Sequence, residues 1–187
     1  MYAKEDFDKA LEVLRNGGVI LYPTDTIWGI GCDAANEKAV ARIYEIKRRA
    51  DSKSMLSLVG SDAMLQNAVR NVPDAAWQLI DAAVNPLTII YDTPSGIAPN
   101  LKAEDGSAGF RITSEPFSKN LCMRLRHPLV STSANISGHP APKTFAEIEK
   151  EIIDAVDYVV EYGRNSSCDR PSNIIKVTDS NVIKVIR

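Results

Sequence analysis

The sequence predicts an α/β fold built on a mixed β-sheet. Apolar residues at helical spacing alternate with short β-branched runs along the first half of the chain, and β-branched runs gather near its end. No linker-like stretch divides the chain, and its 187 residues suffice for one hydrophobic core but are short for two. We therefore expect residues 1–187 to form a single domain.

Local patterns predict the individual elements. Phe7, Leu11 and Leu14 recur at helical spacing within residues 6–16, and two glycines end that run. The apolar run before Pro23 is a strand, which the proline ends because it has no N–H to donate. The same reasoning predicts helices at residues 36–49, 62–71, 74–84, 115–125 and 145–153, and strands at residues 55–59, 87–91, 108–112, 128–131, 158–160, 173–177 and 182–186.

Composition bounds the class of protein. A net charge of −2, from 22 basic and 24 acidic residues, argues against nucleic acid as the main ligand but leaves room for a local basic cleft. The charged N-terminus resembles no signal peptide, and no apolar run is long enough to span a bilayer. Cys32, Cys122 and Cys168 fit no zinc spacing and are expected to be reduced thiols. We expect a cytoplasmic protein without membrane contact.

The first candidate site is the segment of residues 23–31, which follows a strand and precedes a helix. Ligands of α/β proteins favour this position, and the hydroxyls of Thr24 and Thr26 with the Asp25 carboxylate suit a small polar ligand. The alternative is a tight turn in which Asp25 caps local amides. Gly29 and Gly31 are not a dinucleotide fingerprint, because no acidic residue ends a second strand at the expected distance. A Walker A motif is also missing.

The second candidate site is Lys47-Arg48-Arg49 at the predicted end of a helix. Arginine offers a planar fork for phosphate oxygens, and lysine adds a mobile charge, so the run can act as a phosphate clamp. The alternative is a solvated helix end whose cations interact with the helix dipole.

A hydroxyl-rich segment and one arginine complete the candidates. Ser131, Ser133 and Asn135 follow a strand closely enough to wrap a phosphate or ribose, although such a turn can also satisfy its own backbone. Arg111 stands between apolar residues, where it either reaches solvent or binds a ligand carboxylate. The two histidines have no neighbouring ligand pattern, so we predict no metal site built from protein side chains.

Taken together, these segments resemble the YrdC/TsaC family, whose motifs are Pro-Thr-acid-Thr, Lys-x-Arg and Ser-x-Asn in this order. Further matches cover nearly the whole chain and lie in residues 86–90, 109–111, 172–175 and 185–187. The resemblance implies a twisted mixed sheet with flanking helices and a concave, partly basic face. It also implies the short, single-domain form of an L-threonylcarbamoyladenylate synthase. Such an enzyme joins L-threonine, bicarbonate or CO2 and ATP, releases pyrophosphate and serves tRNA threonylcarbamoyladenosine modification.

The resemblance also assigns roles by position. It implies threonine contacts at Thr26, Arg111, Ser131 and Ser172, and ATP contacts at Lys47, Arg49, Ser107, Ser133, Asn135 and Arg187. Lys47 and Arg49 are the residues expected to neutralise charge during the reaction, with Mg²⁺ held through phosphate oxygens. The implied downstream partner is a TsaD-type transferase, and RNA contact at the basic cleft is a further expectation.

Departures from the family pattern keep two alternatives open. The chain has Ala50, Ser54 and Thr113 where the family has prolines, and Leu58 where a polar residue is common, changes expected to touch loop stiffness and the threonine pocket. The alternatives are a non-catalytic RNA-binding module of the same fold and a paralogue with an altered substrate.

Overall fold

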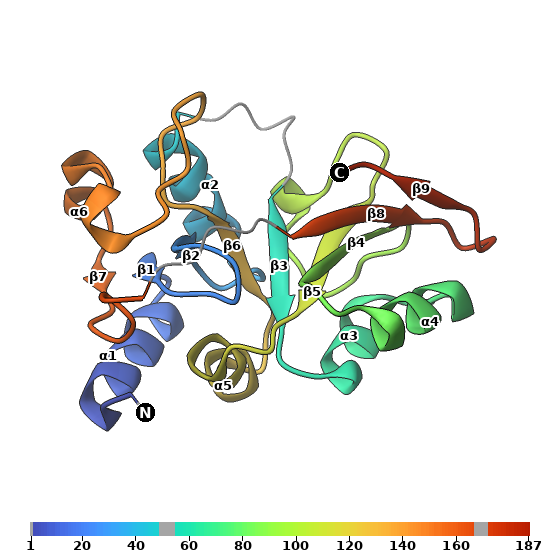
Figure 1. The fold of residues 1–187 in the computed structure, drawn as a ribbon, viewed down its shortest axis with the longest axis horizontal. Helices are drawn as coiled ribbons and strands as arrows, with labels where there is room; N and C mark the ends of the chain where they lie inside the picture. Colours follow the sequence, from blue (N-terminus) through green and yellow to red (C-terminus); the bar gives the residue numbers. More distant parts are fainter. Residues whose placement is uncertain (1, 49–54, 167–171) are drawn as a thin grey trace.

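The computed structural model describes residues 2–48, 55–166 and 172–187 (Figure 1). Its elements follow in the order α1 (Lys4–Arg15), β1 (Ile20–Tyr22), β2 (Gly29–Gly31), α2 (Glu37–Ile46), β3 (Leu56–Val59), α3 (Asp62–Ala68), α4 (Asp74–Ala82), β4 (Leu87–Tyr91), η1 (Pro99–Leu101), β5 (Ala108–Ile112), α5 (Pro116–Leu125), β6 (Leu129–Ser133), η2 (Phe145–Glu147), α6 (Lys150–Ala155), β7 (Tyr158–Val159), β8 (Asn173–Val177) and β9 (Ile183–Val185).

The described strands form one mixed sheet, as the sequence predicts. Its nine strands lie in the order β7-β1-β2-β6-β3-β5-β4-β8-β9. The pairs β1–β7, β3–β5 and β4–β8 are parallel, and the other five pairs are antiparallel. Sequence neighbours are therefore often separated in the sheet, so segments such as β6 and β2 meet only in the tertiary structure.

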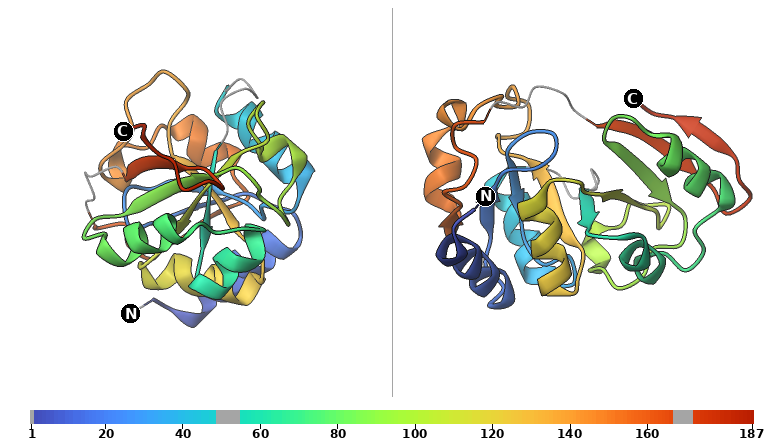
Figure 2. Two further views of the ribbon diagram at one scale, coloured as in Figure 1. Left: turned by 90° about the vertical axis from the view of Figure 1, so that its right-hand side faces the viewer. Right: turned by 60° about the horizontal axis from the view of Figure 1, so that its bottom comes forward.

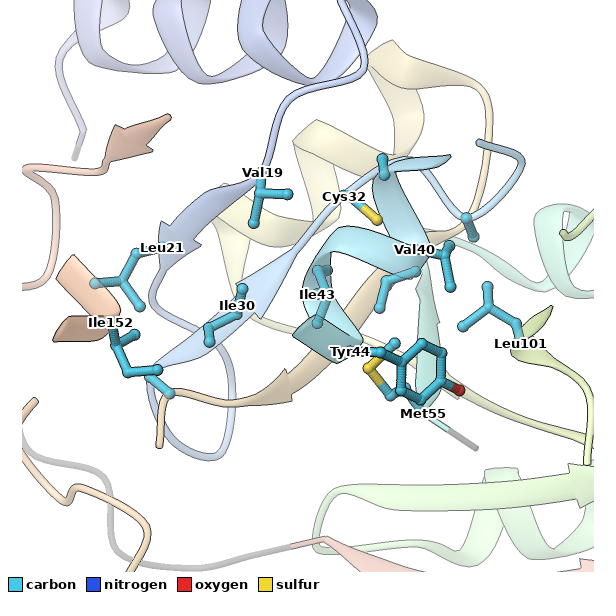
Figure 3. Close-up of a cluster of buried hydrophobic side chains, with 14 of the residues drawn as sticks. Val19, Leu21, Ile30, Cys32, Val40, Ile43, Tyr44, Met55, Leu101 and Ile152 are labelled. Atoms are coloured by element: carbon cyan, nitrogen blue, oxygen red, sulfur yellow. The ribbon is translucent and has the colours of Figure 1, made fainter. Parts of the chain in front are cut away.

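Helix α2 covers one face of the β1-β2-β6 end of the sheet. Val40 and Ile43 of the helix belong to one buried cluster with Leu21 and Ile30 of the sheet (Figure 3). These strand residues alternate with Ile20 and Tyr22, which point to the opposite face. The apolar face of α2 thus fixes the helix, and with it Lys47, against this end of the sheet.

Helices α1 and α5 pack side by side under the opposite face (Figure 2). Leu11 and Leu121 of these helices share a buried cluster with Tyr22 and Leu129 of the sheet. Helices α3 and α4 cover the other end of the sheet, where their side chains join Ile89 and others in a third cluster. No described helix covers the rest of the face that carries α1 and α5, and polar side chains lie there.

Some local predictions differ from the structure. Strand β2 was not predicted, because two glycines in three residues carry no β-strand signal and its formation depends on pairing with β1 and β6. The single helix predicted over residues 145–153 is wrong. Two short helices replace it, because Ile148 is extended and buries its side chain in the core. Helix α2 ends at Ile46 rather than residue 49, since Arg48 adopts a left-handed conformation with φ of 48°.

Candidate functional site

A cavity of about 300 Å³ lies on the face of the sheet that α1 and α5 leave uncovered. Its wall combines hydroxyls and cations with apolar side chains, the mixture typical of a small-molecule site. The lining residues are Thr24, Thr26, Ile27, Trp28, Gly29, Met55, Leu56, Thr88, Ile90, Gly109, Arg111, Ser131, Thr132, Ser133, Ala141, Ser172, Ile174 and Arg187.

Strand alternation explains the polar wall. On β6, Leu129 packs into the core with α5, and Ser131 and Ser133 follow on the same face in the cavity. On β4, Ile89 faces the helices while Thr88 faces the cavity. One set of strands therefore builds both an apolar core and a polar site.

The 24–28 turn closes one side of the cavity, and Thr24 organises it. The Thr24 hydroxyl accepts a hydrogen bond from the Thr26 amide at 3.1 Å and donates to the Ile27 carbonyl at 2.7 Å. It also lies 3.0 Å from the Thr26 hydroxyl. Gly29 follows where space is short, since a Cβ there would lie 3.2 Å from the Ser131 hydroxyl oxygen. The turn is thus organised by the Thr24 hydroxyl, and it brings Thr26 to the cavity wall.

Arg111 is buried, with 3% of its side chain exposed, so it does not reach solvent. Its Nη2 lies 2.8 Å from Asp25 Oδ1 and donates to Thr26 Oγ1 at 3.3 Å. Its Nε has no hydrogen-bond partner in the described part of the chain. An unsatisfied buried donor is costly, so a guanidinium that lines a cavity in this state suits an anionic ligand group such as a carboxylate.

Lys47 contacts the end of β6 and the turn that follows it. The Lys47 ammonium is buried and donates to the carbonyl oxygens of Ser133 and Asn135, the latter at 2.6 Å. The Asn135 side chain donates to the carbonyls of Ile136 and His139. Lys47 and Asn135 lie outside the set of described residues that line the cavity. These two residues therefore shape the turn, and Ser133 is its member on the wall.

The remaining predicted residues occupy several positions. Ser131, Ser172 and Arg187 line the cavity, and the Arg187 backbone is tied to Ile174 by hydrogen bonds in both directions. The Ser107 hydroxyl is buried and donates to Asp105 Oδ1, away from the cavity wall. Asp105 also contacts Lys176, and these bonds lower the pKa of its carboxyl below the usual range. Arg49, with the family departures Ala50 and Ser54, lies outside the described residues.

The structure adds cavity residues that sequence reasoning missed. Thr88 and Ile90 line the cavity, and the alternation of β4 was the signal that could have assigned them to one face.

Two departures from the family pattern lie in the protein interior. Leu58 is fully buried in the core shared with α5, and Thr113 is buried with its hydroxyl 2.8 Å from that of Ser118. Neither is among the described residues that line the cavity.

Comparison with known proteins identifies the family. A family model for the Sua5/YciO/YrdC domain, described as telomere recombination, matches residues 12–187. The chain belongs to this family. A Methanocaldococcus jannaschii relative is 40% identical over 97% of this chain and 87% of its own length. Two proteins named threonylcarbamoyl-AMP synthase, from Stenotrophomonas maltophilia and Vibrio cholerae, are 32% and 33% identical over 95% and 98% of the chain and 96% and 97% of their own lengths.

Solved structures of the Sua5/YciO/YrdC family share the fold. E. coli YciO matches with a TM-score of 0.84 and 24% identity over 99% of this chain and 89% of its own. P. abyssi Sua5, in a crystal structure complexed with L-threonine, matches with a TM-score of 0.83 and 22% identity over 91% of this chain. The present chain spans about half of that Sua5 chain, 50% of its length. The twisted mixed sheet with flanking helices is thus common to the family.

Proposed function

We propose that this chain is a threonylcarbamoyl-AMP synthase, with residues 1–187 acting as one domain. It would join L-threonine, bicarbonate or CO2, and ATP, and release pyrophosphate. The observation that carries the proposal is the cavity wall, where a buried arginine stands among hydroxyls and shares the cavity with Ser133 and Arg187. The Nε of this arginine has no hydrogen-bond partner within the described ranges. The names of the full-length relatives support the same reaction.

The amino acid would bind at the Arg111 side of the cavity. A carboxylate there would accept hydrogen bonds from the guanidinium, including one from Nε, for which the described part of the chain supplies no partner. The hydroxyls of Thr26, Ser131 and Ser172 line the same cavity and would orient the amino and hydroxyl groups. A binding site with these groups suits a small polar amino acid.

The nucleotide would bind at the side formed by Ser133 and Arg187. Lys47 would stabilise the turn and contribute positive charge beneath the phosphates, and the sequence adds Arg49 as a phosphate ligand. Asn135 would support the turn through its bonds to backbone carbonyls. Ser107, for which the family resemblance implies an ATP contact, would lie behind the cavity wall with its hydroxyl bonded to Asp105.

The chemistry needs no protein nucleophile. The threonine ammonium loses a proton to solvent, and the free amine then forms a C–N bond with CO2 and releases a second proton to give a carbamate. A carbamate oxygen then forms a bond with the α-phosphorus of ATP, and the bond from that phosphorus to the pyrophosphate oxygen breaks. The cavity would contribute by holding the two reactants in contact and by neutralising charge on the phosphates.

The proposal also includes a metal ion, which would be Mg²⁺ bound with the nucleotide. Over the residues that the structure describes, no group of three or more His, Cys, Asp or Glu side chains could hold a metal ion. Mg²⁺ would therefore enter with ATP, bound by phosphate oxygens and water.

The product would pass to a TsaD-type transferase that modifies tRNA, with RNA contact at a basic part of the cleft. No described helix has the length and apolar character needed to cross a membrane, and a cytoplasmic location is part of the proposal.

The direct test is incubation with ATP, bicarbonate and each amino acid, followed by measurement of pyrophosphate and the acyl adenylate. We expect threonine-dependent pyrophosphate release, and a loss of at least about tenfold in Arg49→Ala, equivalent to about 1.4 kcal/mol. Salt-sensitive RNA binding without any turnover would favour the RNA-binding module instead. Turnover with a different amino acid would favour the paralogue.

A further inference from the structure

Thr88 and Ser172 form a buried hydroxyl pair on the cavity wall. Their oxygen atoms lie 2.9 Å apart, and only 2% and 4% of the two residues are exposed. Both residues line the cavity. The pair joins two neighbouring strands, since Thr88 lies on β4 opposite Ile174 of β8, and Ser172 immediately precedes β8.

The sheet register places this pair beside Arg111. Strands β4 and β5 are antiparallel, and Ile89 lies opposite Phe110, so the next pair along the two strands is Thr88 opposite Arg111. Side chains that are opposite each other in a sheet share one face, with their Cβ atoms about 4.5–5.5 Å apart. Arg111 and the hydroxyl pair thus lie on one face of the sheet and line the same cavity, so one ligand can contact both.

The hydroxyl pair can form further hydrogen bonds with a ligand. Two hydroxyls carry two O–H donors, and their mutual bond uses one of them. Within the described residues, no other hydrogen bond reaches either side-chain oxygen. The pair thus keeps one O–H donor and several lone pairs for a ligand, in a place where an unsatisfied hydroxyl is costly.

Both members of the pair are held in place. Arg187 Nη2 donates to the Ser172 carbonyl at 3.2 Å, which ties the backbone of Ser172. The Thr88 methyl faces Gly109, where an added Cβ would lie 3.5 Å from Thr88 Cγ2, and its hydroxyl faces Ser172. A rigid pair can select a ligand hydroxyl, because an apolar isostere would leave the pair unsatisfied.

We propose that Thr88, acting with Ser172, recognises the side-chain hydroxyl of the amino-acid substrate and makes the cavity selective for a β-hydroxy amino acid over an apolar isostere. This inference rests on the proposed function. It assigns to Thr88 a role in specificity, distinct from carboxylate binding at Arg111.

The test compares threonine with its apolar isostere valine in wild type and in Thr88→Val, which keeps the shape and removes the hydroxyl. We expect kcat/KM for threonine to fall about 10- to 100-fold and that for valine to change less than about threefold, so that discrimination collapses. The KM for ATP should stay constant. Thr88→Ser, which keeps the hydroxyl, should retain most of the wild-type discrimination.

Thr113→Val is the matched control. Thr113 and Ser118 form a second buried hydroxyl pair, 2.8 Å apart, that does not line the cavity. Removing this hydroxyl costs a similar buried hydrogen bond, and its effect on the melting temperature should match that of Thr88→Val. The ratio of threonine to valine turnover should remain that of wild type.

Two outcomes would overturn the inference. One is an equal loss for threonine and valine in Thr88→Val, and the other is a rise in the KM for ATP, which would place ribose or phosphate at the pair. If wild type releases no threonine-dependent pyrophosphate, the proposed function is wrong, and this result does not test the role of Thr88. Calorimetric binding of threonine and valine without ATP still tests Thr88, because the inference requires Thr88→Val to weaken threonine binding selectively.

Discussion

Arg111 and Lys47 are both buried cations, but the structure uses them differently. Arg111 contacts a carboxylate and a hydroxyl and lines the cavity, and its Nε has no hydrogen-bond partner among the described residues. Lys47 donates to the backbone carbonyls of the turn that follows β6 and lies behind the cavity wall. A cation on the cavity wall can recognise a ligand group, whereas a cation bound to carbonyls fixes the shape of a backbone segment.

Replacing Arg111 should have the larger effect on substrate binding. Arg111→Lys keeps the charge near Asp25 but loses the planar fork and the Nε donor. We expect the KM for threonine to rise by about 100-fold, on the order of 2.7 kcal/mol, with a smaller change in the KM for ATP. Steady-state kinetics with each substrate varied in turn measure the KM for threonine and the KM for ATP separately. Arg70→Lys makes the same change at an exposed position and should leave both constants unaltered.

Replacing Lys47 should affect stability together with activity. Lys47→Met keeps the apolar stem and removes the charged donor shared by the carbonyls of Ser133 and Asn135, at a cost of about 2–4 kcal/mol in the free energy of unfolding. We also expect at least about a tenfold loss of turnover as the turn shifts. Chemical denaturation and pyrophosphate release measure the two effects. Lys38→Met, exposed on the same helix, is the control. A purely kinetic effect with unchanged stability would contradict the supporting role of Lys47.

The smallest expected effect concerns Asp105, the partner of Ser107. Because its native pKa lies below the ordinary value, the ionised carboxylate stabilises the fold above about pH 4, and this contribution is lost as the pH falls through the native pKa. Asp105→Asn should therefore lower the free energy of unfolding by less than about 1 kcal/mol at pH 7, since the carboxylate is largely exposed. The difference between variant and wild type should shrink below about pH 4, which thermal melts at several pH values would detect. A difference that grows toward acid pH would contradict this assignment.

Local patterns predicted much of the fold because most elements carry their own signal. Strands β4, β5 and β8 lie at the predicted residues, and α1 and α5 start or end within two residues of the prediction. The prediction failed where an element depends on its neighbours. Gly29–Gly31 becomes a strand only by pairing on both sides, and Ile148 interrupts a helix because the core accepts its side chain.

The fold class, the family motifs and the residue types of the candidate site can be predicted from local patterns in the chain. The tertiary structure determines which of these residues meet, because a sheet order that departs from chain order brings Thr26, Arg111 and Ser172 to one cavity from distant segments. It also decided the roles of the two buried cations. Whether a cation faces a ligand or a carbonyl depends on which backbone atoms lie within hydrogen-bond reach, and motif order carries no information on that distance.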